Sequence, residues 1–323
     1  WLNTGSMNTA RYYHEVSLLT NGKVLVTGGY DGISYLNSAE LYDSSTGTWT
    51  TTGDMNNVRS VHTTSVLTNG NVLVTGGVDS IAASNSAELY NISTGAWTAT
   101  SSMNTARYHH TASVLTNENV LVTGGLSNSA ELYDPSIGTW TTAGNMNNVR
   151  ETHTASILLN GKVLVAGGSN GSSSLNSAEL YDLSTGIWTV TGSMNNARYR
   201  HTASVLTNGK VLVVGGLDGI SYLNSAELYD PLRGTWTTTG SINNARYDHT
   251  ASLLTNGKVL VTGGHNSDTL NSSELYDLST EIWTTTASMN NARSYHTAVV
   301  LINGNVLVTG GSGTIVLNSS ELY

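Results

Sequence analysis

Tryptophan recurs at a nearly constant interval along this chain of 323 residues, and that interval constrains the fold more than any other feature. The seven tryptophans are Trp1, Trp49, Trp97, Trp140, Trp188, Trp236 and Trp283. They are separated by 48, 48, 43, 48, 48 and 47 residues. A period of roughly 20–50 residues is typical of repeat architectures, in which each unit buries its apolar surface against the next unit. We therefore interpret the chain as seven related units.

Each unit carries the same markers in the same order. An arginine lies ten residues after each tryptophan, and a histidine follows the arginine by three residues. The arginines are Arg11, Arg59, Arg107, Arg150, Arg198, Arg246 and Arg293, and the histidines are His14, His62, His110, His153, His201, His249 and His296. A glycine pair and a Glu-Leu-Tyr triplet complete the unit, from Gly28-Gly29 and Glu40-Leu41-Tyr42 to Gly310-Gly311 and Glu321-Leu322-Tyr323.

The unit contains the pattern of four short β-strands. In the fifth unit, the segment from His201 to Thr207 alternates polar and apolar residues, as a half-buried strand does. Asn208-Gly209 follows, and Asn-Gly is a strong hairpin signal because both positions tolerate positive φ. The continuous apolar run from Lys210 to Gly216 predicts a strand that is buried on both faces. The segment "NSAELY" and the β-branched segment from Gly234 to Gly240 predict the third and fourth strands.

These markers carry a resemblance to a known family. The glycine pair, the tyrosine seven residues before each tryptophan after Trp1 and the Arg-x-x-His motif resemble the kelch repeat. The sequence pattern "NGKVLVTGG…NSAELYD…GTW" is similar to the kelch units of galactose-oxidase-like proteins. The resemblance spans the whole chain and implies an all-β, seven-bladed β-propeller of four-stranded antiparallel blades. It does not specify an activity, because kelch propellers include enzymes, ubiquitin-ligase adaptors and cytoskeletal binders.

The two ends of the sequence complement one another. The last unit stops at Tyr323 without its tryptophan strand, and the chain begins with an unmatched one, "WLNTGSM". We expect residues 1–4 to supply the outer strand of blade seven, which residues 290–323 otherwise form, so that residues 1–323 make one propeller. Such pairing removes an open strand edge. The two ends are then neighbours in space.

The invariant residues of the unit have a structural interpretation. Seven symmetric histidines exceed the three or four ligands of a metal site, so we predict a packing role and no metal. We expect the repeated arginine and glutamate to form ion pairs or hydrogen bonds between strands or blades, because a lone buried charge is costly. The glycine pair permits close backbone approach or positive φ. Tyrosine and tryptophan fill the space between blades.

Two regions of the unit vary between blades. The residue before the histidine reads Tyr13, Val61, His109, Thr152, Arg200, Asp248 and Tyr295, while its neighbours are fixed. The loop after the glycine pair also varies, and in blade three it is five residues shorter. In an antiparallel meander both regions lie on one face, where kelch relatives commonly bind partners. Within "RYYHE", Arg11 and His14 belong to the frame, whereas Tyr12, Tyr13 and Glu15 do not fully belong to it. The candidate binding residues are Tyr13, His109, Arg200, Asp248, Tyr295, Tyr35, Tyr222 and His265.

Composition excludes several classes of function. The chain has no cysteine, so the tyrosine–cysteine cofactor of a copper radical oxidase cannot form. A net charge of −9 disfavours nucleic acid and anionic membranes as partners. The apolar runs are far shorter than the roughly 20 residues of a membrane helix. Four glycosylation sequons, at Asn91, Asn170, Asn271 and Asn318, favour a secreted or extracellular protein.

The leading hypothesis is a non-catalytic binding scaffold that presents its variable rim to a protein or a glycan, without a cofactor. One alternative is a structural module of a longer extracellular or surface protein. Another is an enzyme, either galactose-oxidase-like or glycan-processing. No isolated Ser/His/Asp set is apparent. A carboxylate pair for glycoside hydrolysis would have to come from Asp31, Asp79, Asp218 and Asp268, whose separation the sequence does not fix.

Overall fold

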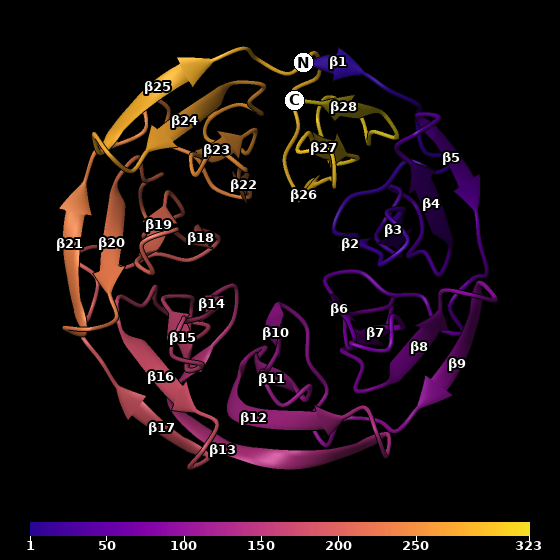
Figure 1. Ribbon diagram of the computed structural model, residues 1–323, viewed down its shortest axis with the longest axis horizontal. Helices are drawn as coiled ribbons and strands as arrows, with labels where there is room; N and C mark the ends of the chain where they lie inside the picture. The colour runs from indigo at the N-terminus through magenta and orange to yellow at the C-terminus, as the bar shows by residue number, and fades with distance from the viewer.

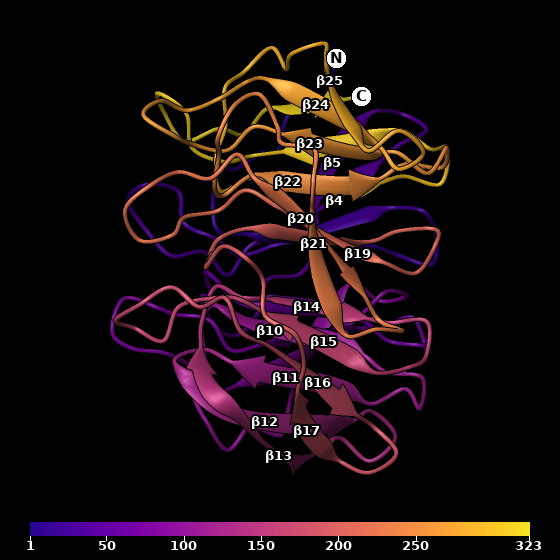
Figure 2. The same cartoon turned by 90° about the vertical axis from the view of Figure 1, so that its left-hand side faces the viewer.

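The protein is a ring of seven antiparallel sheets around a central axis (Figure 1). The computed structural model describes residues 1–323, and its regular structure consists of 28 strands without a helix. Each sheet has four strands that follow one another in sequence, with one exception at the ring closure. Loops project from both faces of the ring, with the strands between them (Figure 2). The predicted seven-bladed, all-β propeller is confirmed.

The strands of the first four blades have the following bounds. Blade one consists of β2 (Glu15–Leu18), β3 (Val24–Thr27), β4 (Ala39–Asp43) and β5 (Thr48–Thr51). Blade two consists of β6 (Thr63–Val66), β7 (Val72–Thr75), β8 (Ala87–Asn91) and β9 (Ala96–Thr100). Blade three consists of β10 (His110–Val114), β11 (Val120–Gly124), β12 (Ser127–Asp134) and β13 (Thr139–Arg150). Blade four consists of β14 (Thr154–Ile157), β15 (Val163–Ala166), β16 (Ala178–Asp182) and β17 (Ile187–Val190).

The remaining three blades follow the same order from the axis outward. Blade five consists of β18 (Thr202–Val205), β19 (Val211–Val214), β20 (Ala226–Asp230) and β21 (Thr235–Thr239). Blade six consists of β22 (Thr250–Leu253), β23 (Val259–Thr262), β24 (Ser273–Asp277) and β25 (Ile282–Thr286). Blade seven consists of β26 (Thr297–Val300), β27 (Val306–Thr309), β28 (Ser320–Leu322) and β1 (Leu2–Asn3).

The hydrophobic core lies between adjacent blades. The second strand of every blade is buried along its whole length, as its continuous apolar sequence predicts. Between blades seven and one, Val24 and Val26 of β3 pack in one cluster with Leu301 and Leu307. A blade cannot bury both of its faces alone, so each blade depends on its two neighbours.

The tyrosine and tryptophan of each repeat join the outer half of a blade to the preceding linker. Tyr42 and Trp49 lie opposite one another on β4 and β5, with ring centroids 5.1 Å apart. Trp49 Nε1 donates to the carbonyl oxygen of Gly5 at 3.0 Å, and the Tyr42 hydroxyl lies 2.7 Å from Thr4 Oγ1. Both amphipathic rings therefore bury their apolar bodies while satisfying their polar groups.

The N-terminal strand closes the ring. β1 pairs antiparallel with β28, with Leu2 opposite Leu322 and Asn3 opposite Glu321. Trp1 and Tyr323 lie 5.1 Å apart, which reproduces the tyrosine–tryptophan pair of the other blades. The N- and C-termini lie side by side at the outer edge of blade seven (Figure 1). The predicted closure is confirmed.

The glycine pair allows the segment that leads into the next blade to approach closely. Gly28 and Gly29 have φ values of 58° and 98°, which favour glycine. A Cβ atom on Gly28 would lie 2.3 Å from the carbonyl oxygen of Arg59 in blade two. Gly29 N donates to that same oxygen at 2.7 Å. Both predicted reasons for the glycines, positive φ and close approach, therefore apply.

Blade three departs from the pattern because its variable loop is shorter. The chain passes almost directly from Gly125 into β12, which has 8 residues, and β13 extends to 12 residues. Ser127 pairs with Arg150 at the far end of this long hairpin. Blade three thus replaces a rim loop with a strand extension, and β13 is the longest arrow in Figure 1.

Candidate functional site

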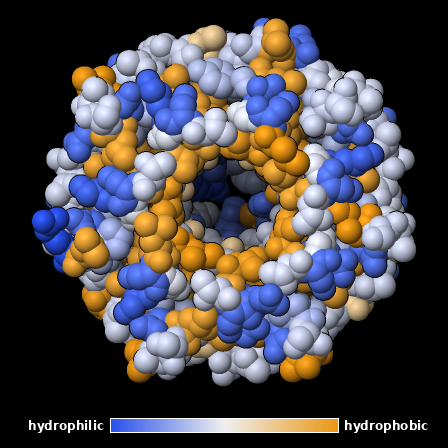
Figure 3. Space-filling model, viewed as in Figure 1, coloured by the Kyte–Doolittle hydropathy of each residue, from blue (hydrophilic) through white to orange (hydrophobic).

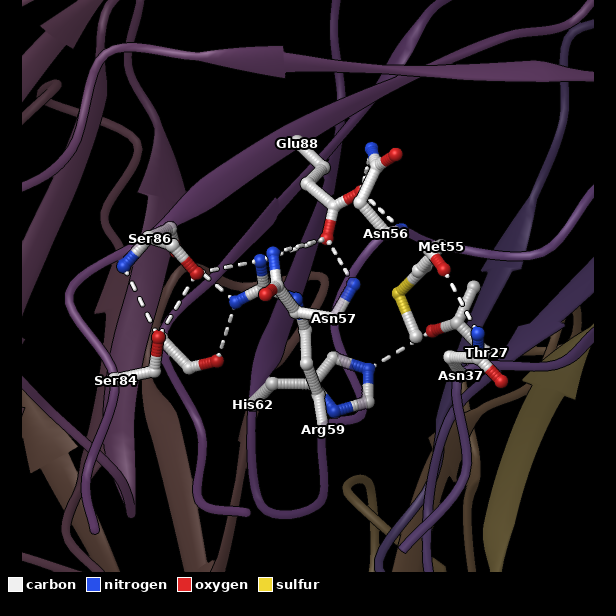
Figure 4. A network of polar contacts seen from close by, with 11 residues as sticks. Thr27, Asn37, Met55, Asn56, Asn57, Arg59, His62, Ser84, Ser86 and Glu88 are labelled. Atoms are coloured by element: carbon white, nitrogen blue, oxygen red, sulfur yellow. Dashed lines mark hydrogen bonds and ion pairs between the residues drawn. The ribbon is translucent and has the colours of Figure 1, made fainter.

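The repeated arginine and glutamate form a buried ion pair in every blade, as Figure 4 shows for blade two. Arg59 Nη2 lies 2.9 Å from Glu88 Oε1, and Arg59 Nη1 donates to the carbonyl oxygens of Gly76 and Ser86. The backbone and side-chain amides of Asn56, which belongs to the linker from blade one, donate to Glu88 Oε2 at 2.7 and 2.6 Å. Burial would raise the pKa of Glu88, but the hydrogen bonds from Asn56 and Arg59 hold it below its ordinary value. The pair thus fastens the linker from blade one to blade two.

The repeated histidine links each blade to the preceding blade. The His201 Nε2 atom lies 3.0 Å from Thr154 Oγ1 of blade four, and His62 Nε2 lies 2.9 Å from Thr27 Oγ1 of blade one (Figure 4). All seven histidines are buried. Burial lowers their pKa values, to about 3 in His14, His110, His153 and His249. No three histidine, cysteine or acidic side chains group closely enough to hold a metal ion. These contacts agree with the packing role predicted for the histidines.

The variable residue before each histidine has a left-handed backbone in all seven blades. Its φ lies between 49° and 55°, although none of the seven is glycine. Its N–H donates to the carbonyl oxygen of the equivalent residue in the preceding blade, as in Val61 to Tyr13 at 3.0 Å. The bond from Tyr13 to Tyr295, at 3.3 Å, closes the circle. We call this circle of seven backbone hydrogen bonds the axial ring. It fixes the backbone at these positions and leaves the side chains free to differ.

The side chains of the axial ring surround a cavity of about 250 Å³ on the propeller axis. The axial-ring residues that line it are Tyr13, Val61, His109, Thr152, Asp248 and Tyr295. Glu15, Thr297 and six of the repeated histidines complete the lining. Figure 3 shows the central opening of the molecule on one face, with hydrophobic residues around its mouth and hydrophilic residues deeper inside. The cavity itself is mainly polar, because only 3 of its 14 lining residues are hydrophobic.

The axial-ring residues of blades five, six and seven form one polar cluster. Arg200 Nη1 lies 2.7 Å from Asp248 Oδ2 and donates to the Tyr295 hydroxyl at 3.1 Å. The Arg200 guanidinium also lies over the Tyr295 ring, 5.7 Å from its centroid. Burial raises the pKa of Asp248 despite the opposing charge of Arg200. Burial also lowers the pKa of His109 to about 4, with a further contribution from Arg200, so His109 is a neutral donor and acceptor.

An aromatic wall adjoins this cluster. Tyr13 and Tyr295 have ring centroids 4.5 Å apart, and Tyr13 meets His109 edge-on at 6.1 Å. The sequence placed all five of these predicted residues on one face, and the structure brings Tyr13, His109, Arg200, Asp248 and Tyr295 together around one axis.

The other three predicted residues lie farther from the axis. Bridges from Tyr12 to Tyr30 and from Tyr30 to Tyr35 continue the blade outward, which places Tyr35 two steps from the axial ring. Tyr222 occupies the equivalent position in blade five, whereas His265 of blade six bridges Tyr247 directly and so lies one step from the axial ring. These residues share the predicted face but do not line the axial cavity.

Sequence reasoning missed the tyrosines that connect the two zones. Tyr12 contacts Tyr13, Tyr30 and Tyr295, at centroid distances of 5.1, 5.6 and 6.1 Å. Tyr247 stacks on Tyr222 at 5.6 Å and meets His265 edge-on at 5.5 Å. The signal was present, because tyrosine stands two residues before the histidine in four of the seven units.

Three of the four acidic residues of the variable loops, Asp31, Asp79 and Asp218, shape their own turns. Asp31 Oδ1 accepts the backbone N–H groups of Ile33 and Ser34, both at 2.7 Å. Asp79 and Asp218 accept equivalent bonds in blades two and five. These side chains form Asx-turns on separate blades. The paired-carboxylate alternative therefore gains no support.

Comparison with known families identifies the repeat. The KLHDC2/KLHL20/DRC7 Kelch-repeats domain matches residues 129–311, and the Kelch motif matches residues 16–56 and 59–104. The chain belongs to the kelch-repeat family. The resemblance seen in the sequence is confirmed, and kelch-repeat proteins are typically protein-interaction scaffolds.

Individual relatives share the repeat but only part of their length. Kelch-like protein 24 from Rattus norvegicus, Homo sapiens and Mus musculus is 48% identical over 44 residues, which cover 14% of this kelch chain and 7% of each relative. A fungal alcohol oxidase of the AA5 family, solved in complex with copper, superposes with a TM-score of 0.81 at 19% identity. That match covers 98% of this chain and 74% of the oxidase and shows the fold alone.

The residues of this kelch propeller do not fit the copper centre of that oxidase class. The chain has no cysteine for a cross-linked tyrosine. The Nε2 atoms of the repeated histidines are engaged by threonine hydroxyls, as in the pairs of Thr202 with His249 and Thr297 with His14. We therefore derive no step that involves copper.

No helix in the structure is long and apolar enough to cross a membrane.

Proposed function

We propose that this kelch propeller is a non-catalytic binding module whose ligand, a segment of a protein, enters the axial cavity. The observation that carries the proposal is the axial ring. Seven equivalent positions share one backbone conformation, yet they bear tyrosine, valine, histidine, threonine, arginine and aspartate. The fold requires one backbone conformation at these seven positions but no particular side chain. The side chains are therefore available for recognition.

The chemistry of the cavity suits a polar ligand. Arg200 bonds through Nη1 alone to Asp248 and Tyr295, two residues of the lining, which leaves N–H groups on its other nitrogens. The paired rings of Tyr13 and Tyr295 offer an apolar surface beside these donors. Tyrosine and arginine of this kind dominate binding energies in protein interfaces.

Exposed isoleucines on the same face favour a protein ligand over a glycan. Ile33, Ile81, Ile220 and Ile315 are 87, 90, 96 and 69% exposed. All four lie in the variable loops around the cavity, where apolar tips are expected to contact a partner's surface. A glycan would stack on the tyrosine rings but would gain little from contact with the exposed isoleucine side chains.

A catalytic role is not proposed. The loop carboxylates shape their own turns, and the repeated histidines hold the blades together. The alternative of a structural module without a specific ligand remains the competing hypothesis, and the binding experiment distinguishes it.

The test is a screen of a peptide display library and a glycan array, followed by titration of the hits. The variants are Tyr13→Asn and Arg200→Asn, because asparagine tolerates the left-handed backbone at these positions. Arg233→Ala is the matched control, since Arg233 lies 76% exposed in the β20–β21 turn on the opposite face. We expect the first two variants to weaken a peptide hit by about tenfold or more.

Thermal melts accompany each titration. We expect the melting temperatures of both variants to stay within a few degrees of the parent protein. Loss of stability with normal ligand binding, or equal sensitivity to Arg233→Ala, would show that the axial ring belongs to the frame and that the proposal is wrong.

A further inference from the structure

Glu15 breaks the repeat at a position that is otherwise constant. The residue after the repeated histidine is threonine in the other six blades: Thr63, Thr111, Thr154, Thr202, Thr250 and Thr297. In blade one it is Glu15. A residue that breaks the repeat without improving the packing or hydrogen bonding of the fold is expected at a functional position.

The threonine has a defined structural task in the other blades. Its hydroxyl bonds to Nε2 of the next blade's histidine, at 2.9 Å for Thr63 with His110 and 2.8 Å for Thr297 with His14. Glu15 does not take part in the corresponding contact. His62 bonds instead to Thr27, which lies opposite Glu15 on β3. The frame therefore does not need a carboxylate at residue 15.

Glu15 lines the axial cavity without a charged partner. No arginine, lysine or histidine forms an ion pair with it, whereas Asp248, the other acidic residue of the lining, is paired with Arg200. Burial raises the pKa of Glu15 to about 8, and no charged side chain contributes to that shift. Glu15 is the one acidic side chain of the cavity lining that lacks a counterion.

Apart from Asp248, which is paired with Arg200, the titratable groups that line the cavity with Glu15 are neutral at physiological pH. His14 precedes it on the same strand, His62 comes from blade two and His296 from blade seven. Burial lowers the pKa of His14 to about 3 and holds those of His62 and His296 well below the ordinary range. Burial raises the pKa of the nearby Tyr13 hydroxyl, so it is uncharged as well.

We propose that Glu15 binds an ammonium group, namely that of a lysine side chain which the protein ligand inserts into the axial cavity. The inference rests on the proposed function and names the chemistry of the inserted group. An ammonium ion is favoured by a carboxylate together with aromatic faces, which Tyr13 and Tyr295 supply in the lining that they share with Glu15. The cavity volume of about 250 Å³ accommodates a four-carbon chain, since one water occupies about 30 Å³.

The test uses N-acetyl-lysine methylamide as the probe and N-acetyl-norleucine methylamide as its uncharged counterpart. Isothermal titration calorimetry measures both with the parent protein, Glu15→Gln and Glu15→Thr. We expect the lysine probe to bind the parent more tightly than norleucine does, and either substitution to weaken lysine binding by about tenfold or more. D-glucosamine serves as a second source of the same ammonium chemistry, and its preference over the lysine probe would overturn the assignment to a peptide.

Glu15→Thr separates a binding role from a structural one. It restores the residue of the other six blades, and its hydroxyl can bond to His62 as the equivalent threonines bond to their histidines. We expect the melting temperature to stay the same or to rise while lysine binding is lost. A clear fall in melting temperature, or unchanged lysine binding, would overturn the inference.

Proton release provides an independent readout. Glu15 is largely protonated at pH 7 when the cavity is empty, because its pKa is raised to about 8. Binding of the lysine probe should therefore release close to one proton, and affinity should rise from pH 6 to about pH 8.5, where the amine is still charged. Heats measured in two buffers of different ionisation enthalpy report the proton count. A pH-independent affinity in the parent protein would contradict the inference.

The outcomes distinguish this inference from the proposed function. If a peptide hit depends on Tyr13 and Arg200 but neither on its lysine nor on Glu15, then the inference alone fails. If the lysine probe depends on Glu15 but no macromolecular ligand depends on the axial ring, then the proposed function fails.

Discussion

The axial ring places ordinary residues in a conformation that they seldom adopt. Val61 and Thr152 are β-branched, and their φ values are 55° and 50°. For a β-branched residue, positive φ brings Cβ close to the following carbonyl oxygen and costs about 1–2 kcal/mol. The ring of backbone hydrogen bonds holds these residues in place. Strain that persists at the wall of a cavity is typical of functional sites.

Replacement of Val61 by glycine should therefore stabilise the protein. Relief of about 1–2 kcal/mol of strain exceeds the roughly 0.5–1 kcal/mol that glycine loses through the entropy of the unfolded chain. We expect the free energy of unfolding to rise by up to about 1 kcal/mol in urea titrations, and Val61→Ala, which keeps a Cβ atom, to gain less. A Val61→Gly variant less stable than the parent would show that the valine side chain contributes more than its backbone strain costs.

The strands and their order were predictable because the repeat encodes them seven times. Alternation, the Asn-Gly turn and the apolar run fix β18 and β19, and the same signals recur in the other units, except that Asn117-Glu118 replaces Asn-Gly in the third. The positive φ of the axial ring was not predictable, since tyrosine, valine and arginine carry no signal for it. The extension of β12 and β13 depends on how a shortened loop is accommodated, which only the packed blade decides.

The candidate site divides in the same way. The variable positions could be recognised within one sequence, because their neighbours are constant. The convergence of Arg200, Asp248 and Tyr295 on one axis follows from the closure of the ring and required the structure. Glu15 was visible as an exception, but its lack of a partner became apparent only from the contacts of Thr27 and His62. The binding role of these residues stays a prediction.

Removal of residues 1–7 should destabilise every blade and not blade seven alone. The deletion removes β1, the contact of Trp1 with Tyr323 and the buried side chain of Met7, which packs between blades seven and one. We expect a loss of several kcal/mol, a large share of a typical 5–15 kcal/mol. Thermal melts and urea titrations measure it. Leu2→Ser is the control, because Leu2 is 72% exposed. Unchanged unfolding of the truncated protein would contradict closure by β1.

At the scale of the whole molecule, the repeat multiplies one buried polar frame by seven. Each blade contributes one buried arginine–glutamate pair and one neutral buried histidine. A buried ion pair specifies geometry more than it adds stability, because desolvation offsets the attraction. All seven histidines are buried, so protonating any of them would place a charge in an environment that disfavours it. The effects of pH on the seven histidines therefore add up in the free energy of unfolding of the ring.

The stability of the propeller should consequently fall at unusually mild acidity. The folded pKa of each repeated histidine lies below its unfolded value of about 6.5, reaching about 3 in His110 and His153. Below pH 6.5 the unfolded chain therefore binds more protons than the folded one, and the histidine contribution is lost as pH falls toward the folded pKa. Each histidine contributes a slope of about 1.4 kcal/mol per pH unit once the pH is well below 6.5.

The buried glutamates of the arginine–glutamate pairs also reduce stability as the pH falls, but at a lower pH than the histidines. Hydrogen bonds, opposing the effect of burial, lower the pKa values of Glu88 and Glu179. Their contribution is present above an unfolded pKa of about 4.3 and is lost below it. We expect melting temperatures to decline steeply between about pH 6 and pH 4.5, before carboxylate protonation dominates. His201→Ala should reduce that slope by close to one proton. A melting temperature that stays constant from pH 7 to pH 4.5 would mean that the histidines are protonated in the folded ring, and the neutral Thr–His frame described here would then be wrong.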